Sequence, residues 1–310
     1  MKVLVTGGAG FIGSHLVRKL QKMQAETVVL DNLSTGLRQN LPAGTVLWEM
    51  DVRTAEAQQK IIEGKFDAIV HLTGQTMVDV SLREPAEDAD QNVMGTVNVL
   101  EAARKSGVKR VIFASTAASY GDVAEKDLPV VEDQPLKPMS FYGLSKVTVE
   151  KYLAMYRQIF GLSYVALRFA NVYGERQGDG GEGGVISIFT KRLAQGKDIA
   201  VYGDGGQTRD FIYAGDVAEG IWAAITAAES KANTVYNLST QTETSLKELV
   251  AVLAEIAGRE IVPVYKEARP GDIYRSMLSN ERVCRELGWK PQMPLKEGLR
   301  RTYEHFCQVK

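Results

Sequence analysis

Close to its N-terminus, the chain carries a set of glycines that few local structures can accommodate. Gly7, Gly10 and Gly13 are spaced three apart, residues 8–13 also fit the pattern G-x-G-x-x-G, and the apolar run Val3–Thr6 precedes them. Glycine is needed where a strand turns tightly into a helix, where the backbone touches a phosphate, and where the helix packs closely on the strand. The pattern therefore predicts a strand, a turn and a helix whose N-terminus binds the pyrophosphate of a dinucleotide.

The residues that follow favour this interpretation over the alternative, a glycine-rich hairpin. Leu16, Leu20 and Met23 would lie on one face of a helix that starts at the turn, as burial against a sheet requires. Such a helix would direct its free N-terminal amides toward the phosphates.

Two acidic residues end the next predicted strands. Asp31 lies 18 residues beyond the last of the three glycines, where a carboxylate can accept hydrogen bonds from both hydroxyls of an adenosine ribose. This favours NAD over NADP, because a 2'-phosphate would meet like charge and the following Asn32 and Leu33 carry no positive charge. Asp51 is expected near the adenine amino group. The alternative for Asp31, an ordinary turn aspartate, is disfavoured by its distance from the glycines.

The first half of the chain alternates short apolar runs with amphipathic stretches, which is typical of a doubly wound parallel α/β sheet. Strands are predicted at Val3–Thr6, Thr27–Leu30, Val46–Glu49, Ala68–His71, Val111–Ala114 and Tyr164–Arg168, and helices at Asp90–Lys105 and from Tyr142 to about Ile159. After Tyr173 a glycine-rich stretch, 178–184, interrupts the alternation. We therefore expect a Rossmann domain over 1–172, to which 208–239 returns, and a smaller C-terminal α/β lobe over 173–207 and 240–310.

Composition excludes several classes of partner. With 37 basic and 38 acidic side chains the net charge is -1, so no overall field attracts nucleic acid or a membrane surface. Cys284 and Cys307 are too few for a disulfide framework, which favours a reducing, cytoplasmic compartment. We expect no export signal or membrane span, and no metal site, since His15, His71 and His305 lack metal-type spacing.

A candidate catalytic pair lies at the start of the second long helix, which is expected to begin near Ser140. Tyr142 and Lys146 are four residues apart, and therefore on one face of that helix. A neighbouring ammonium favours the phenolate and lowers the pKa of a tyrosine from about 10 by roughly 1 to 3 units. Tyr142 could then act as a general base on a hydroxyl, while Lys146 also binds a ribose hydroxyl. The alternative is that the pair only decorates a solvated helix.

A hydroxyl near this pair is expected from the preceding strand. Ser115 and Thr116 end that strand, where a doubly wound sheet presents residues to its crevice. We favour Thr116 for a hydrogen bond to the reacting oxygen, and expect Ser115 to cap local backbone. The alternative is that both hydroxyls only cap backbone groups.

Together these motifs resemble the extended short-chain dehydrogenase/reductase superfamily and, within it, the nucleotide-sugar epimerases of the UDP-glucose 4-epimerase type. The resemblance covers essentially the whole chain and includes Thr6–Gly13, Asp31-Asn32, Asp51-Val52, His71-Leu72, Asn92, Ser115-Thr116, Tyr142 with Lys146, Arg168–Gly174, Tyr202–Gly205, Arg209–Phe211 and Arg269–Asp272. It implies a retained NAD that oxidises C4 of a UDP-hexose, rotation of the 4-keto sugar, and return of hydride to the opposite face.

The resemblance, added to the motifs, gives a full set of expected site residues. Thr116, Tyr142 and Lys146 are expected to be catalytic. NAD is expected to contact Gly7, Gly10, Phe11, Ile12, Gly13, Asp31, Asn32, Ser34, Thr35, Gly36, Asp51, Val52, Leu72, Thr73, Gly74, Gln75, Asn92, Ser115, Tyr142, Lys146 and Ala170. The nucleotide sugar is expected to contact Thr116, Tyr142, Asn171, Val185, Ile186, Tyr202, Arg209, Arg269, Asp272 and Ser276. The two arginines could clamp a diphosphate, or simply form surface ion pairs.

Departures from the family pattern bear on the reaction and the sugar. Related 4,6-dehydratases and decarboxylases have an acidic residue just after the Thr, where this chain has Ala117 and Ala118, so elimination is disfavoured. Leu72–Thr76 replaces the usual small alanines, and Met77 follows. Ser276 stands where some epimerases have a bulky tyrosine, which predicts room for the 2-acetamido group of a UDP-N-acetylhexosamine.

Two other functions share these residues. A reductase or dehydrogenase of a nucleotide-linked sugar would use the same Tyr142 and Lys146, and a regulator could bind the dinucleotide without turnover. The family resemblance also implies a homodimer that pairs through the helices at Asp90–Lys105 and Tyr142–Ile159.

Overall fold

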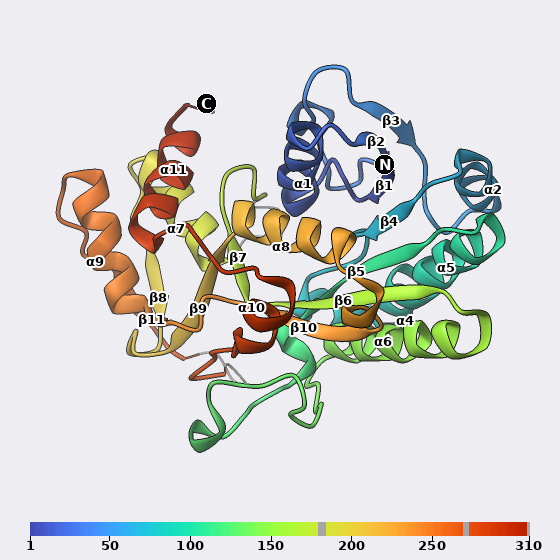
Figure 1. Ribbon diagram of the computed structural model, residues 1–310. Coiled ribbons are helices and arrows are strands. Elements are labelled where there is room, and N and C mark those ends of the chain that lie inside the picture. Colours follow the sequence, from blue (N-terminus) through green and yellow to red (C-terminus); the bar gives the residue numbers. More distant parts are fainter. Residues whose placement is uncertain (179–183, 269–272, 309–310) are drawn as a thin grey trace.

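The computed structural model (Figure 1) describes residues 1–178, 184–268 and 273–308. Within these residues the centre is a seven-stranded sheet in the order β10-β6-β5-β4-β1-β2-β3, and every neighbouring pair of strands is parallel. The strands are β1 (Lys2–Thr6), β2 (Glu26–Asp31), β3 (Val46–Glu49), β4 (Ala68–His71), β5 (Arg110–Thr116), β6 (Ser163–Phe169) and β10 (Thr234–Leu238). The predicted doubly wound fold class and its first six strands are confirmed.

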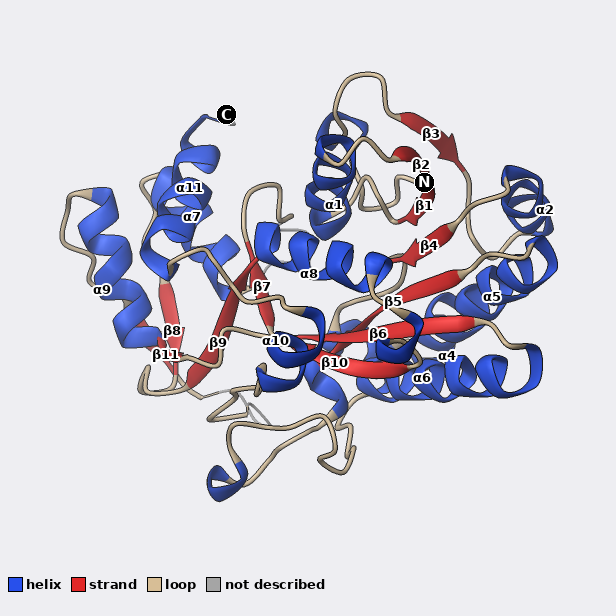
Figure 2. Cartoon of the chain, in the orientation of Figure 1, coloured by secondary structure: helices blue, strands red, loops and turns tan. Residues whose placement is uncertain are grey.

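Helices cover both faces of this sheet (Figure 2), because alternate strand residues point to opposite sides. Val3 and Val5 pack in one core cluster with α1 (Phe11–Lys22) and α8 (Ala214–Thr226). Leu4 packs in the other with α2 (Ala55–Gly64), α5 (Gly95–Ser106) and α6 (Phe141–Phe160). Both faces of the strands are therefore apolar, as parallel sheets require.

Two predicted helices differ from the structure in detail. Leu16 and Leu20 of α1 are fully buried, but Met23 caps the C-terminus of that helix and is 42% exposed, so its predicted place on the buried face is wrong.

The helix predicted at Asp90–Lys105 is composite. After α3 (Val78–Arg83), the short α4 (Pro85–Ala89) runs into a π-helical turn (Asp90–Met94) and then into α5. The wider turn is a recognised mark of functional sites.

The C-terminal part of the chain builds a smaller unit beside the sheet. Its strands form a three-stranded sheet, β11-β9-β7, and a pair, β12-β8. These strands are β7 (Asn171–Tyr173), β8 (Ala200–Tyr202), β9 (Thr208–Tyr213), β11 (Glu243–Ser245) and β12 (Val264–Lys266), and the helices are α7 (Val185–Ala194), α9 (Leu246–Ala257) and α11 (Leu295–Gln308). Its apolar core is separate from the two clusters of the large sheet. The helix α10 (Glu281–Leu287) instead packs against β10, and its Val283 belongs to a core cluster of the large sheet.

The segment 208–239, expected to return to the first domain, is shared between the two units. Its helix α8 packs on α1 and its strand β10 extends the large sheet, whereas β9 pairs with β7 and β11. The domain division itself stays a prediction.

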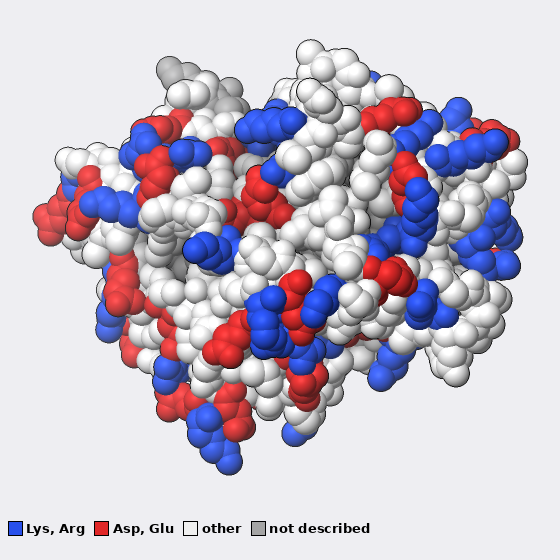
Figure 3. Space-filling view, viewed as in Figure 1, with Lys and Arg blue, Asp and Glu red and all other residues white. Residues whose placement is uncertain are grey.

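On the face shown in Figure 3, basic and acidic side chains are interspersed. None of the helices within the described residues combines the length and the apolar character that a bilayer span needs.

Candidate functional site

A cleft of about 1330 Å³ opens at the carboxyl ends of the parallel strands and extends to the C-terminal unit. This is where a doubly wound sheet places its ligand site. The predicted cofactor residues that line it are Gly7, Gly10, Phe11, Ile12, Gly13, Asp31, Asn32, Ser34, Thr35, Gly36, Asp51, Val52, Leu72, Thr73, Gly74, Gln75, Ser115, Tyr142, Lys146 and Ala170. The structure thus brings residues from the ends of six strands, β1 to β6, into one space.

The glycine turn is closed so tightly that side chains would not fit. Gly7 has a φ of +70°, and a Cβ on it would stand 2.9 Å from the backbone nitrogen of Thr73. A Cβ on Gly13 would stand 2.2 Å from the carbonyl oxygen of Gly7. The N-terminus of α1 therefore faces the cleft with bare backbone, which is the geometry that a pyrophosphate needs.

Asp31 lies at the end of β2 with its carboxylate fixed by backbone amides. Oδ2 accepts from the amide of Ala9 at 2.9 Å, and Oδ1 accepts from that of Leu33 at 2.9 Å. Burial raises the pKa of this carboxyl, and the two amide bonds act against that rise. A Cβ on Gly36 would approach Oδ1 to 2.9 Å, so the glycine leaves that oxygen accessible to a ribose.

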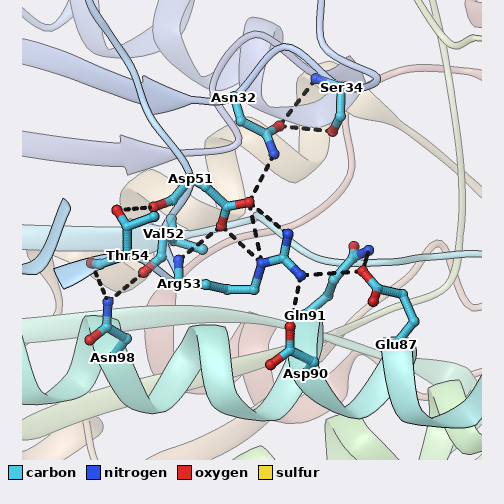
Figure 4. Close-up of polar contacts among 10 residues, drawn as sticks. All are labelled: Asn32, Ser34, Asp51, Val52, Arg53, Thr54, Glu87, Asp90, Gln91 and Asn98. Carbon is cyan, nitrogen blue, oxygen red and sulfur yellow. Dashed lines mark hydrogen bonds and ion pairs between the residues drawn. The ribbon is translucent and has the colours of Figure 1, made fainter. Parts of the chain in front are cut away.

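The adenosine end of the cleft is organised by one arginine that the sequence analysis did not single out (Figure 4). Arg53 donates to Asp51 through Nε and Nη2, and through Nη1 to Asp90 at 2.7 Å and Glu87 at 3.2 Å. Asn32 donates to Asp51 as well, at 3.3 Å. The hydrogen bonds from Arg53 are the main reason why the pKa of Asp51 lies below its usual value.

The catalytic candidates line the same cleft at the other end. Ser140 caps α6 by accepting from the amide of Gly143, as the sequence predicted, and Tyr142 and Lys146 follow on the first turns. The Lys146 ammonium lies 4.9 Å from the centre of the Phe113 ring and 5.8 Å from that of Tyr142. Burial lowers the pKa of Lys146 to about 8, because an ammonium in an apolar site loses its hydration.

Of the two hydroxyls at the end of β5, Ser115 differs from the expectation, and Thr116 lies in the cleft. Ser115 Oγ donates to Glu150 Oε1 at 2.6 Å, so it does not cap local backbone. Thr116 Oγ1 accepts from the amide of Ala118 at 3.2 Å. An accepting hydroxyl keeps its own proton for donation, and Thr116 lines the cleft with Tyr142.

Asn92 is the predicted cofactor residue that lies behind the wall of the cleft. It belongs to the π-helical turn, is 2% exposed, and does not line the cleft. Its Nδ2 donates to the Gln75 carbonyl, to Asp88 and to Ser145. Its Oδ1 is buried and has no hydrogen-bond partner among the described residues.

Only some of the predicted substrate residues line the cleft. Lining the cleft are Thr116, Tyr142, Asn171, Val185, Ile186, Arg209 and Ser276. Tyr202, on β8, does not line it, and the Lys266 ammonium lies 5.7 Å from its ring centre. Arg269 and Asp272 lie outside the described residues, so the predicted two-arginine clamp stays a prediction.

Sequence reasoning missed several other cleft residues. Besides Arg53, they include the start of α3, with Val78 and Asp79, and Gln177 after β7. The Gln177 amide oxygen is buried without a partner among the described residues. The position of Arg53 two residues after Asp51 could have revealed it, whereas no motif marks Gln177.

These features fit an NAD molecule. The bare glycine turn, the Asp31 carboxylate and the buried ammonium of Lys146 line one cleft, and they suit the pyrophosphate, the adenosine ribose and the nicotinamide ribose respectively. Across the described part of the chain, no group of three His, Cys, Asp or Glu side chains could hold a metal ion.

Comparison with known proteins agrees with this geometry. The model of the NAD-dependent epimerase/dehydratase family matches residues 3–239. A UDP-glucose 4-epimerase of Mycolicibacterium smegmatis is 38% identical over 99% of this chain and 98% of its own. The UDP-glucose 4-epimerase of Thermotoga maritima, solved with UDP-glucose, has a TM-score of 0.95 at 39% identity and covers 100% and 99% of the two chains. That of Thermus thermophilus, solved with NAD, has a TM-score of 0.92 at 40% identity and covers both chains fully.

Proposed function

The chain belongs to the NAD-dependent epimerase/dehydratase family, and we propose that it is a 4-epimerase of a UDP-hexose that works through a transient 4-keto sugar. The observation that carries the proposal is the shared cleft: Thr116, Tyr142 and Lys146 line it together with the glycine turn. Relatives with this activity match the chain over nearly its whole length.

We propose that the chain holds NAD by three of its own devices. The N-terminus of α1 binds the pyrophosphate, Asp31 accepts the adenosine ribose hydroxyls, and Lys146 donates to the nicotinamide ribose. Asp51 and its partners close the adenine end. When bound, NAD would accept the hydride from C4 of the sugar and later return it.

The proton of the sugar hydroxyl is handled by Tyr142. When C4 is oxidised, the phenolate oxygen of Tyr142 takes the proton of the 4-hydroxyl, so that a ketone forms without a charged sugar oxygen. After the 4-keto sugar has rotated in the site, the same phenol returns the proton to the re-forming alcohol. Thr116 donates a hydrogen bond to this oxygen throughout, which holds it in place.

Lys146 makes this base possible at neutral pH. A positive charge 5.8 Å from the Tyr142 ring centre favours the phenolate over the phenol. Because the pKa of Lys146 is about 8, its side chain is protonated in most protein molecules at pH 7. The residues after Thr116 are Ala117 and Ala118, which supply no acid for elimination, so the 4-keto sugar is reduced again and not dehydrated.

The nucleotide sugar enters from the C-terminal unit. We propose that Asn171, Arg209 and the N-terminus of α7, at Val185 and Ile186, bind the diphosphate, with Arg269 and Asp272 as further contacts. Ser276 lines the cleft, and we propose that it lies at the sugar end, where its small side chain would leave room for a 2-acetamido group. UDP-N-acetylhexosamines are therefore proposed substrates beside plain UDP-hexoses.

We also propose a cytoplasmic homodimer. Leu144, Tyr152, Met155 and Ile159 form an apolar stripe along α6, each at least 40% exposed, and the family resemblance places the partner's helices here. Both described cysteines are free thiols, in keeping with a reducing compartment. Light scattering should give twice the chain mass, and Met155→Glu should reduce it to that of a monomer.

The direct test is to incubate the purified protein, without added cofactor, with UDP-glucose, UDP-N-acetylglucosamine and dTDP-glucose, and to identify products by NMR. We expect the C4 epimers of both UDP-sugars and no accumulation of NADH. Stoichiometric oxidation or reduction of a nicotinamide cofactor would indicate the alternative, a reductase or dehydrogenase.

Two further outcomes separate the remaining proposals. Turnover of UDP-glucose alone would refute the proposed role of Ser276. If no sugar turns over, and Tyr142→Phe leaves the protein's cellular function intact, the chain is a dinucleotide-binding regulator.

A further inference from the structure

The ammonium of Lys146 is one of the least accessible charges in the described part of the molecule. Its side chain is 4% exposed, and it rests over the Phe113 and Tyr142 rings. Cation–π contacts of this kind compensate only part of the hydration that a buried ammonium loses. A buried positive charge that has to persist near neutral pH therefore needs a buried negative charge nearby.

Asp88 is a buried carboxylate on the neighbouring α4, and neither the motifs nor the mechanism above assign it a task. It is 1% exposed, and α4 and the following π-helical turn pack against α6. Its Oδ1 accepts from Gln75 Nε2 at 2.8 Å and from Asn92 Nδ2 at 3.1 Å. Both donors are side-chain amides, so the carboxylate is buried inside a polar cluster and not against apolar side chains alone.

The same contacts fix the orientation of the Asn92 side-chain amide. Because Nδ2 is occupied by Asp88, Gln75 and Ser145, the amide cannot flip, and Oδ1 faces the space above Gly74. A Cβ on Gly74 would stand 2.3 Å from that oxygen and 3.7 Å from Lys146 Nζ. The Asn92 oxygen and the Lys146 ammonium thus border the same space above Gly74, and the Asp88 carboxylate lies directly behind Asn92, to which it is hydrogen-bonded.

The other titratable groups around Lys146 do not supply this charge. His71, at the end of β4, is neutral near pH 7, because burial lowers its pKa to about 3, with a smaller contribution from Lys146 itself. Tyr142, on the same helix, is the group whose proton the mechanism needs. Asp88 is the charge that raises the pKa of Lys146 against the effect of burial.

We propose that Asp88 is a positioning residue of the active site: its carboxylate locks Asn92 in one orientation and keeps the Lys146 ammonium protonated. This inference rests on the proposed role of Lys146 in the reaction, but its main test does not require turnover.

The test is Asp88→Asn, which keeps the shape and an oxygen that can accept both amide hydrogen bonds while it removes the charge. The ε-methylene resonance of Lys146, observed in protein labelled at lysine Cε and identified by its absence from Lys146→Met, is followed from pH 6 to 11 without NAD. It is expected to titrate near pH 8 in the unaltered protein and roughly one unit lower in Asp88→Asn. If Asp88→Asn does not fold, Asp88→Ser is titrated instead.

Activity gives a second readout that a purely structural role would not move. With a lower Lys146 pKa, the alkaline limb of kcat/KM shifts to lower pH. Asp88→Asn should therefore lose roughly fivefold at pH 8 and less than twofold at pH 6.5. A structural defect would instead lower activity by a similar factor at every pH.

The matched control is Glu84→Gln, an exposed residue four positions earlier in the chain, which loses the same charge outside the cluster. It should leave the Lys146 titration where it is. An unchanged Lys146 titration in the Asp88 variants would overturn the inference. A shifted titration without any epimerase activity would support it and overturn the proposed function alone.

Discussion

Both ends of the cleft carry charged groups, but water reaches these groups to very different extents. At the adenosine end, the Arg53 side chain is 33% exposed and its partners Asp51, Glu87 and Asp90 are 25%, 49% and 52% exposed. At the catalytic end, Lys146 and Asp88 are 4% and 1% exposed. Water screens the first group and has almost no access to the second.

This difference sets the expected size of any change. An exposed ion pair contributes little, because solvent and salt weaken it. A buried charge loses its hydration, so it shifts pKa values and lowers stability unless another charge compensates. Substitutions at the catalytic end should therefore change both chemistry and stability, whereas those at the adenosine end should change cofactor affinity only slightly.

The largest effect is expected from Tyr142→Phe. Loss of the phenol removes the general base, which is worth roughly 10² to 10⁴ in kcat, while NAD binding, measured by calorimetry, should stay within a few fold. Tyr265→Phe, on an exposed strand of the C-terminal unit, is the matched control and should keep full activity. Comparable activity in the two variants would show that another group carries the proton.

Sequence patterns predicted the glycine turn and most of the sheet well, because local rules decide them, but they did not reveal Arg53 at the adenosine end. The glycine spacing, the strand ends at Asp31 and Asp51, and the helix start at Ser140 each depend on a few neighbouring residues. The strand that contains Arg209, β9, was harder to assign to a sheet. It pairs with β7 and β11 and not with the large sheet. Pairing between distant segments is not encoded in the pattern of one segment.

The catalytic end was predicted only in part, for a related reason. Tyr142, Lys146 and Thr116 stand in motifs, but the partners that fix them are buried polar groups without one. Asp88 looks like an ordinary helix residue until folding brings it to Gln75 and Asn92. The π-helical turn that carries Asn92 interrupts a pattern that otherwise predicts a single regular helix.

The second largest effect is expected from Lys146→Met. This variant should lose its activity, yet its free energy of unfolding should rise. Burial lowers the Lys146 pKa from 10.5 to about 8, so protonation favours the unfolded state, and keeping this charge buried costs about 3 kcal/mol at pH 7. The gain in unfolding free energy, measured in urea, should shrink between pH 8 and 10.5, because both states then hold a neutral lysine.

The control for that comparison is Lys151→Met, an exposed lysine on the same helix. Its effect on the free energy of unfolding should be within a few tenths of a kcal/mol and independent of pH. If Lys146→Met destabilises the protein at pH 7, the buried ammonium is better compensated than its surroundings indicate, and the contrast between the two ends is lost.

The smallest effect is expected at the adenosine end, from Arg53→Gln. Without the guanidinium, Asp51 loses its main hydrogen-bond donor, and three carboxylates repel one another beside the cofactor. The Kd for NAD should rise by about two- to fivefold at low salt, and this difference should fade toward 0.5 M salt as the charges are screened. Arg38→Gln, which removes an exposed pair with Glu49, should leave the Kd unchanged. A loss of affinity in Arg53→Gln that is large and independent of salt would show that Arg53 acts as a desolvated charge, as Lys146 does at the other end.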